Sequence, residues 1–481
     1  MRRIAIVATV LATVTVGAQR RAPEIETITQ RDMKADLTFL ASDAMGGRLT
    51  DTPQNALAAE WVASRFARLG LEPIGDKGTY YQTYRLATAT LGEGNAMTGA
   101  TMGTDWYPAR FSPSATIKGE LVFAGFGISS PDRGYDDYTD AVKGKVVIAL
   151  DHEPGERDDK SIFDGLVTAQ EADQLQKALA AQARGAIGIL FVTDLHNHEA
   201  SPDVAGASAI TWPRQQQPRI PRYMLGSWIE RLKIPAAQVS STVVRKLVSA
   251  AGKGRTLEDL ARASETTRGS RPVFLGGAQI EMTTAVNRKF INDRNVVGLL
   301  EGSDPKLKDE LVIVCAHYDH DGTNGENVLN GADDDGSGTV GVIEIAEAYA
   351  LAAQKGQRPR RSILFAAWNS EERGLLGAWA YTERPIFALP RTVAVLNMDM
   401  IGRNEEVPEA NSGRFRGLEA QTSESNNNAV NIIGTTRSAS LKGSIEKANS
   451  GVGLTLRFRY DNNISQLMRR SDHWPFLNRG V

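Results

Sequence analysis

The clearest pattern in the chain is a set of short apolar runs, without polar alternation, in its last third. These runs lie at residues 295–300, 310–316, 362–368 and 392–397. Strands covered on both faces of a sheet have this pattern. Helical apolar spacing at 340–353 predicts a helix between the second and third strands. The alternation predicts an α/β sandwich with a mainly parallel or mixed sheet, whose chemistry lies at the carboxyl ends of the strands.

The first half of the chain shows two further patterns. Residues 33–41 and 56–69 have helical spacing, and no strand core is evident around them. From residue 112 the pattern changes to strand-like runs at 120–126, 145–150 and 187–192, with a helix predicted at 169–184. We therefore expect a compact α/β insert over residues 112–260, followed by a polar return linker at 253–271.

The amino terminus has the layout of a secretory signal peptide. Arg2 and Arg3 form a positive region, residues 4–16 are mostly apolar, and a small-residue cleavage site ends at Ala18. No later segment is long and apolar enough to cross a bilayer. We expect residues 1–18 to be removed and the protein to be secreted or periplasmic.

Composition narrows the classes of partner. Of 481 residues, 41% are apolar and 23% are charged, and the formal net charge is −2. The basic residues are scattered, so nucleic acid is not an expected partner. Cys315 is the only cysteine, which excludes an internal disulfide and favours a buried strand thiol.

Metal-type ligands follow three of the predicted strands. His317 and Asp319 follow the strand at 310–316, the Glu371–Glu372 pair follows the strand at 362–368, and Asp399 follows the strand at 392–397. An acidic triplet at 333–335 precedes the predicted helix, and a further imidazole stands at His473. Each group alone is weak, but all of them occur in order within one predicted domain.

The residue types indicate a zinc site with two metals. Imidazole and carboxylate ligands suit zinc when water or substrate must share the site. Two neighbouring metals need a carboxylate that bridges them and terminal ligands on each side. Of the adjacent glutamates Glu371 and Glu372, one can bind metal while the other accepts a proton from water. Asp319 can hold the imidazole of His317 in its binding tautomer.

The motifs HYDH, GADDDGSG, NSEERGLLG, LNMDMIGR and SDHWPF resemble, in order, the metal-site motifs of co-catalytic di-zinc aminopeptidases. Their superfamily also includes glutamate carboxypeptidases, glutaminyl cyclases and transferrin receptors. The insert at 112–260 resembles a protease-associated domain. The resemblance implies a three-layer α/β/α fold with a mixed sheet, formed by residues 22–111 and 272–481. Family members usually continue beyond the point where this chain ends, so we expect a C-terminal truncation.

The resemblance also implies a role for each site residue. Asp334 would bridge two zinc ions and precede a cis peptide bond, Glu371 would be the general base, and Asp319 would support His317. Tyr460 is a candidate oxyanion donor. The resemblance implies that His317 and Asp399 complete one zinc site and that Glu372 and His473 complete the other.

The predicted reaction is the hydrolysis of N-terminal peptide bonds of peptides or proteins. A carboxypeptidase or glutaminyl cyclase is the first alternative, and a carboxypeptidase would need an arginine cluster, for which only Arg373 and Arg403 are candidates. A receptor-like binding module is the second alternative, and it predicts damaged ligands. The histidines without an implied ligand role are interpreted as surface or loop residues, namely His152, His196, His198 and His320. Of these, His320 is near the predicted site and is the one candidate for a supporting role.

Overall fold

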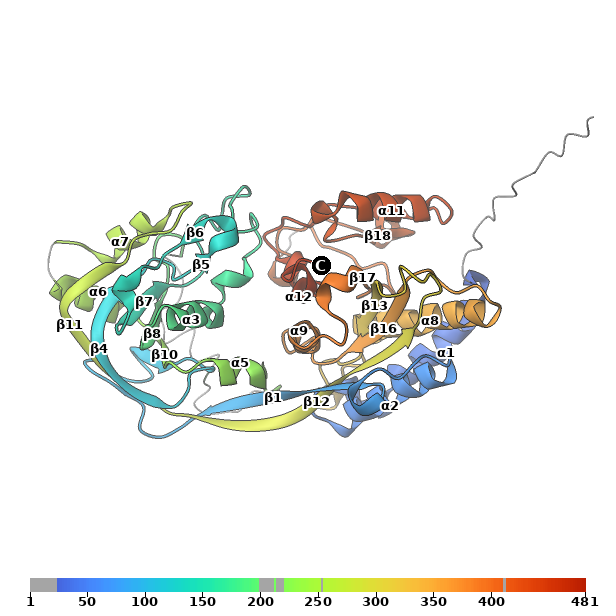
Figure 1. Ribbon diagram of the computed structural model, residues 1–481, viewed down its shortest axis with the longest axis horizontal. Helices are drawn as coiled ribbons and strands as arrows, with labels where there is room; N and C mark the ends of the chain where they lie inside the picture. The colour runs from blue at the N-terminus through green and yellow to red at the C-terminus, as the bar shows by residue number, and fades with distance from the viewer. Residues whose placement is uncertain (1–23, 199–211, 213–219, 252–253, 410–411) are drawn as a thin grey trace, which may run out of the picture.

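The computed structural model describes residues 24–198, 212, 220–251, 254–409 and 412–481. The predicted signal peptide at 1–18 lies outside these residues. Two halves, each built on its own sheet, are joined by a long ribbon of two strands (Figure 1).

The first sheet has six strands in the order β17-β13-β16-β12-β1-β9. β13 pairs in parallel with β16 and β17, whereas β12 is antiparallel to β16 and β1. The predicted mixed α/β sheet is thus confirmed. The bounds of its strands are β1 Tyr81–Leu91, β9 Met224–Leu225, β12 Val286–Leu300, β13 Leu311–His317, β16 Ser362–Trp368 and β17 Thr392–Asn397.

Helices cover both faces of this sheet. Val314 of β13 packs in one apolar cluster with residues of α2 and α8, and α1 also contacts α8. Cys315, the next residue, packs on the opposite face with residues of α9 and α12 and is fully buried. The alternating faces of one strand therefore define three layers. The bounds of the helices are α1 Gln30–Leu40, α2 Pro53–Arg68, α8 Gly338–Gln354, α9 Leu376–Glu383 and α12 His473–Leu477.

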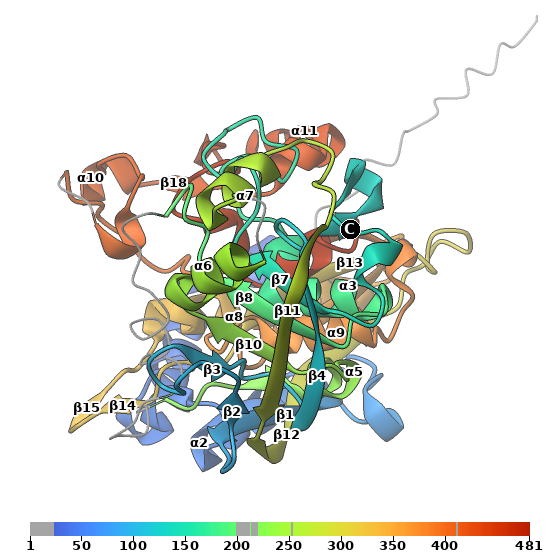
Figure 2. The ribbon, with the colours of Figure 1, turned by 90° about the vertical axis from the view of Figure 1, so that its left-hand side faces the viewer.

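The second sheet has seven strands in the order β2-β11-β4-β7-β8-β10-β3. Figure 2 shows β4 and β11 running side by side along the half that faces the viewer. The sheet includes strands on both sides of the range 112–260 expected for the insert. Its strands are β2 Ala96–Met97, β3 Trp106–Pro108, β4 Ala115–Phe123, β7 Val146–Leu150, β8 Gly188–Val192, β10 Ala236–Val239 and β11 Val273–Thr284, and its helices are α3 Gln174–Ala183, α6 Ser241–Ala250 and α7 Leu257–Ser264.

The ribbon that joins the halves consists of β1 and the first part of β12 (Figure 1). The two strands pair from Tyr81 with Val296 to Leu91 with Val286. β1 was not predicted, because its sequence YQTYRLATATL mixes apolar and polar residues and has no continuous apolar run. The amino-terminal part of the chain thus contributes a strand to the first sheet as well as two helices.

The remaining elements are short, apart from the three-turn helix α11, which lies over the half of the molecule that contains the six-stranded sheet (Figure 1). Within the described residues, no helix is both long and apolar enough to span a bilayer. The bounds are β5 Ser129–Ser130, β6 Tyr135–Asp136, α5 Gly226–Arg231, β14 Thr323–Asn324, β15 Asn327–Val328, α10 Ser423–Asn426, β18 Ala429–Asn431, α11 Ala439–Asn449 and β19 Thr455–Arg457.

Candidate metal centre

Three loops with metal-type ligands meet at one edge of the first sheet. β13 lies between β16 and β17 and is parallel to both. The carboxyl ends of all three strands therefore face the same edge. His317 is the last residue of β13, Glu371 and Glu372 follow β16, and Asp399 follows β17. This is the convergence that the apolar runs predicted.

The imidazole of His317 lies among carboxylates. Its Nε2 is 3.3 Å from Asp334 Oδ1, 3.8 Å from Glu371 Oε2 and 3.8 Å from Asp399 Oδ2. His317 is only 1% exposed, and its buried Nε2 has no hydrogen-bond partner. Burial lowers its pKa, but the charge of Glu371 and the other acids raises it well above the usual value. An excess of negative charge around an unpartnered imidazole nitrogen is the environment that a cation would neutralise.

Two residues of the acidic triplet have different roles: Asp335 stabilises the local backbone, and Asp334 faces the site. Asp335 is fully buried, and its carboxylate accepts hydrogen bonds from the backbone N–H groups of His317 and Gly338. Asp334 instead faces His317, and the Asp334–Asp335 peptide bond is cis, as the resemblance implied. Asp334 also has a carboxylate oxygen within 4.8 Å of ligand atoms of His320 and Glu372. Its carboxylate therefore lies between two groups of potential ligands.

His320 belongs to the site, although it was interpreted as a loop residue. Its Nδ1 is 2.7 Å from Glu372 Oε1, and that buried nitrogen forms no hydrogen bond. The sequence did carry a signal, since His320 stands three residues after His317 in the motif HYDH. The loop interpretation failed because the path of the chain after β13 turns this side chain back towards Glu372.

Asp319 orients the turn that carries the paired glutamates. Its Oδ1 accepts from the backbone N–H of Glu371 at 3.0 Å, and its Oδ2 accepts from that of Glu372 at 3.3 Å. The Nδ1 of His317 lies 3.2 Å from the main-chain oxygen of Asp319 and 3.6 Å from its carboxylate. One buried residue thus positions both the imidazole and the glutamate turn, with its backbone carbonyl closest to the imidazole.

Glu371 is a buried carboxylate beside the other ligands. It is 7% exposed, and burial, together with the nearby Asp399 and Asp472, raises its pKa well above the usual value. A carboxylate with a raised pKa can accept a proton and release it near neutral pH. Asp472, which the sequence interpretation did not use, is fully buried, and neither of its oxygens has a hydrogen-bond partner.

Arg48 joins the loops of the site and was also missed. Its side chain is fully buried in the loop after α1. The guanidinium donates to the carbonyls of Leu40, Tyr318, Asn330 and Gly331 at 2.7–2.8 Å. These bonds connect the loop after β13 with the loop that carries the acidic triplet. Burial lowers the pKa of Arg48 to about 10, so it remains charged at neutral pH.

A pocket of about 480 Å³ opens onto the same residues. Four of the predicted metal ligands line it, namely Asp334, Glu372, Asp399 and His473, together with Glu371. His473 begins α12, which Phe476 anchors against Trp368 and Tyr381 of the first sheet and α9. Burial lowers the pKa of His473 to about 4, and its Nε2 has no hydrogen-bond partner. A neutral imidazole with an available nitrogen is the form that binds a metal.

Tyr460 lies elsewhere. It is 4% exposed, and its hydroxyl accepts a hydrogen bond from the Gln421 side chain at 2.9 Å. The lining of the pocket, as far as the structure describes it, does not include Tyr460. The oxyanion role therefore stays a prediction without geometric support.

The residues present fit a metal. Three buried imidazole nitrogens, on His317, His320 and His473, lack hydrogen bonds within the described residues. Those of His317 and His320 stand beside carboxylates, and His473 lines the same pocket as Glu371 and Glu372. Imidazole and carboxylate together are the ligand set of zinc sites that also hold water. We refer to these three histidines with Asp334, Glu371, Glu372 and Asp399 as the candidate metal centre. The arrangement defines an α/β protein with a metal-binding site at the carboxyl edge of its mixed sheet.

Comparison with known proteins agrees with an α/β protein that has a metal-binding site at the carboxyl edge of its sheet. Residues 295–481, which contain the whole centre, match the sequence profile of peptidase family M28. The probable glutamate carboxypeptidase AMP1 of Arabidopsis thaliana is 25% identical over 374 residues, covering 75% of this chain and 46% of the plant protein. The aminopeptidase NAALADL1 of Rattus norvegicus is 35% identical over 130 residues, covering 26% of this chain and 16% of the rat protein.

The chain thus spans less than half the length of either curated relative. Among solved structures, the aminopeptidase from Aneurinibacillus sp. strain AM-1 aligns over 95% of this chain and 84% of its own, with 14% identity and a TM-score of 0.46.

Proposed function

We propose that this protein is an exported zinc-dependent exopeptidase that hydrolyses N-terminal peptide bonds. The observation that carries the proposal is the pocket in which Glu371 stands beside four predicted metal ligands. His317, in contact with Asp334 and Asp399, completes the predicted set of five.

The donor set is divided so that two ions can be held. His317 and Asp399 would hold one ion, Glu372 and His473 would hold the other, and Asp334 would be the carboxylate shared by both. His320 is an additional donor on the side of Glu372. Zinc bound in this way supplies a water of lowered pKa and polarises the scissile carbonyl.

Glu371 is the proposed general base. Its buried carboxylate accepts a proton from the attacking water and then gives that proton to the nitrogen of the leaving amine. The raised pKa of Glu371 suits this exchange, because burial disfavours its charged form. Asp319 holds the Glu371 backbone in place through the hydrogen bond at 3.0 Å.

Aminopeptidase activity is favoured over carboxypeptidase activity by the charges around the pocket. A substrate carboxylate needs arginines with free hydrogen-bond donors. Arg373 is paired with Asp321, and Arg403 lies 2.9 Å from Asp333 and 2.8 Å from Glu405, so both candidates are already neutralised. Among the described residues that line the pocket, five are acidic and one is an arginine, Arg470. This excess of negative charge favours a protonated N-terminus.

The test uses aminoacyl-p-nitroanilides and N-blocked peptides, each with and without a chelator. We expect hydrolysis only of substrates with a free amine, abolished by the chelator and restored by Zn²⁺. Glu371→Gln should retain its zinc and lose about 10²–10⁴-fold in kcat. Glu326→Gln, an exposed residue between β14 and β15, is the matched control and should be unchanged. Hydrolysis of blocked peptides alone, or unchanged turnover in Glu371→Gln, would contradict the proposal.

A further inference from the structure

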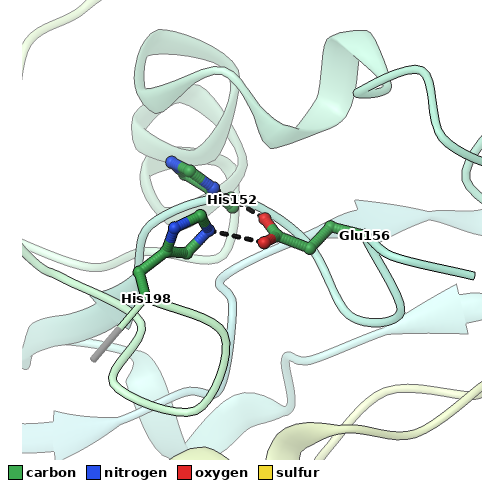
Figure 3. Close-up of side chains that lie close together, drawn as sticks. All are labelled: His152, Glu156 and His198. Atoms are coloured by element: carbon green, nitrogen blue, oxygen red, sulfur yellow. Dashed lines mark hydrogen bonds and ion pairs between the residues drawn. The ribbon is translucent and has the colours of Figure 1, made fainter. Parts of the chain in front are cut away.

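Two histidines and a glutamate meet at the edge of the seven-stranded sheet, outside the motifs discussed above. The Nδ1 of His152 lies 2.7 Å from Glu156 Oε2, and the Nε2 of His198 lies 2.5 Å from Glu156 Oε1 (Figure 3). The three potential ligand atoms lie within 4.8 Å of one another. We call these residues the His–Glu–His cluster. His152 is exposed and His198 is partly buried, so the surface interpretation holds for His152, but the sequence did not show that the two side chains meet at Glu156.

The topology of the second sheet explains the convergence. β7 ends at Leu150 and β8 ends at Val192, and the two strands are parallel neighbours. The loops after them therefore leave the same edge of the sheet. His152 and Glu156 belong to the first loop and His198 to the second. The cluster thus has the same position in its sheet as the candidate metal centre has in the other.

Neighbouring groups hold both loops in place without using the cluster itself. Glu265 accepts from the backbone N–H of Gly155 at 2.8 Å and from the Asn197 side chain at 2.7 Å. Asp194 is fully buried, accepts from Asn197 at 2.7 Å, and its carbonyl accepts from the His198 N–H at 3.0 Å. The three ligand side chains are therefore carried by an ordered frame, which is a requirement for selective metal binding.

The imidazole of His198 shows the same feature as the histidines of the candidate metal centre. Its Nε2 is buried and has no hydrogen-bond partner, even though the carboxylate of Glu156 is within 2.5 Å. Across the described residues, the other histidines with a buried, unpartnered ring nitrogen are His317, His320 and His473. The signature that marks the first centre thus recurs once, in the His–Glu–His cluster.

A simple ion pair is the competing explanation. Glu156 could serve only to neutralise protonated imidazoles, and Arg157 Nε, 3.9 Å from Glu156 Oε1, adds a positive charge. The side chain of Arg157 is 70% exposed, however, and its guanidinium donates to the carbonyl of Asn197. It therefore leaves the inner side of the cluster to the two imidazoles.

We propose that His152, Glu156 and His198 bind a divalent transition-metal ion, with Zn²⁺ as the best match, at a site separate from the candidate metal centre. Two imidazoles and one carboxylate are a zinc ligand set that leaves a fourth position for water. Ligand atoms ~2.0–2.2 Å from zinc stand roughly 3.3–3.6 Å apart. The present contacts need to open by only about 1 Å, which the half-exposed side chain of His152 permits.

The ion ties together two loops at the boundary between the halves. His152 lines a pocket of about 1060 Å³ whose other lining residues include Glu372 and Arg373. Zinc at the cluster fixes the loop after β7 to the loop after β8, and so fixes one wall of this pocket. Its contribution is to loop order, because the cluster shares no ligand with the candidate metal centre.

The test is a zinc titration of the full chain after removal of metal with a chelator. Isothermal titration calorimetry and metal analysis after desalting should give one more zinc per chain for the wild type than for the double variant His152→Ala, His198→Ala. His196→Ala, from the same loop but outside the cluster, is the matched control and should keep the full count. Glu156→Gln keeps the shape of the side chain but removes its charge, and this variant should also lose the additional zinc.

The two proposals fail in different ways. Asp334→Ala should lose zinc from the candidate metal centre and keep the zinc that depends on His152. Equal zinc counts in the wild type and the double variant would overturn the proposal of a separate site and leave the ion pair as the explanation. A count that falls only in Asp334→Ala would support the exopeptidase proposal alone, and one that falls only in the double variant would support the separate site alone.

Discussion

Replacing Arg48 by methionine tests how the candidate metal centre is held. The substitution keeps an unbranched side chain of similar length but removes every donor. The carbonyls of Leu40, Tyr318, Asn330 and Gly331 then lose hydrogen bonds of 2.7–2.8 Å in a fully buried setting. A buried carbonyl left without a donor costs ~1–3 kcal/mol. Four such losses at the lower end of this range predict that the free energy of unfolding falls by about 4 kcal/mol.

Urea unfolding followed by tryptophan fluorescence measures this loss. Hydrogen–deuterium exchange of peptides 311–320 and 330–338 locates it, since Arg48 joins these two loops. Zinc affinity should fall as well, because one loop carries His317 and His320 and the other carries Asp334. Arg68→Met is the control, since its ion pair with Glu347 is about half exposed and is worth ~0–1 kcal/mol. A loss below ~1 kcal/mol with unchanged exchange would show that other donors satisfy the four carbonyls.

Three further outcomes follow from the structure. Burial, and then the charge of Glu347, raises the pKa of Glu344 to about 7, so this residue favours folding most below pH ~4.5 and loses that contribution as the pH rises through 7. Relative to wild type, Glu344→Gln should therefore gain up to ~3 kcal/mol of stability between these pH values. A difference in urea midpoints that does not change with pH would contradict this assignment. Leu396 and Phe415 are among the apolar residues of the pocket, so leucyl-p-nitroanilide should be hydrolysed faster than the glutamyl compound, and Leu396→Glu should reduce that ratio. N-terminal sequencing of the protein recovered from outside the cytoplasm should begin directly after Ala18, and an intact Met1 would contradict export by signal-peptide cleavage.

The strands that carry the site could be predicted from the sequence because each of them is a continuous apolar run. β16 and β17 occupy 362–368 and 392–397, the ranges of two predicted apolar runs, and β13 is shifted by one residue from its predicted range of 310–316. Both faces of β13 and β16 are covered, so almost every position is apolar and the polar residues that follow mark the carboxyl end. β17 has the same apolar pattern although it lies at the edge of the sheet, where Val393 and Leu396 are 49% and 41% exposed. The ligands were found because they follow that end directly.

Elements with one solvent-facing side were harder to predict. β1 and the first half of β12 form the ribbon between the halves, and β12 opens with the polar sequence VNRKFINDRN. Such strands have no continuous apolar run, and their pairing is set by a partner about two hundred residues away in the chain. The helix predicted at 169–184 is shorter in the structure, Gln174–Ala183, because residues 170–172 form a separate turn. Local periodicity does not fix where a helix begins when tertiary contacts hold the preceding turn.

The two side chains missed at the first centre have a common cause. Arg48 acts through the nearby carbonyl of Leu40 and the carbonyls of two distant segments, and His320 depends on the path of a loop after its strand has ended. Neither relation has a fixed spacing in sequence. The His–Glu–His cluster follows the same rule, since His152 and His198 lie on loops after two different strands and neither motif is distinctive alone. What brings them together is the parallel pairing of β7 with β8. Parallel sheets therefore produce candidate sites that a sequence reveals only when each loop carries its ligand directly at the strand end.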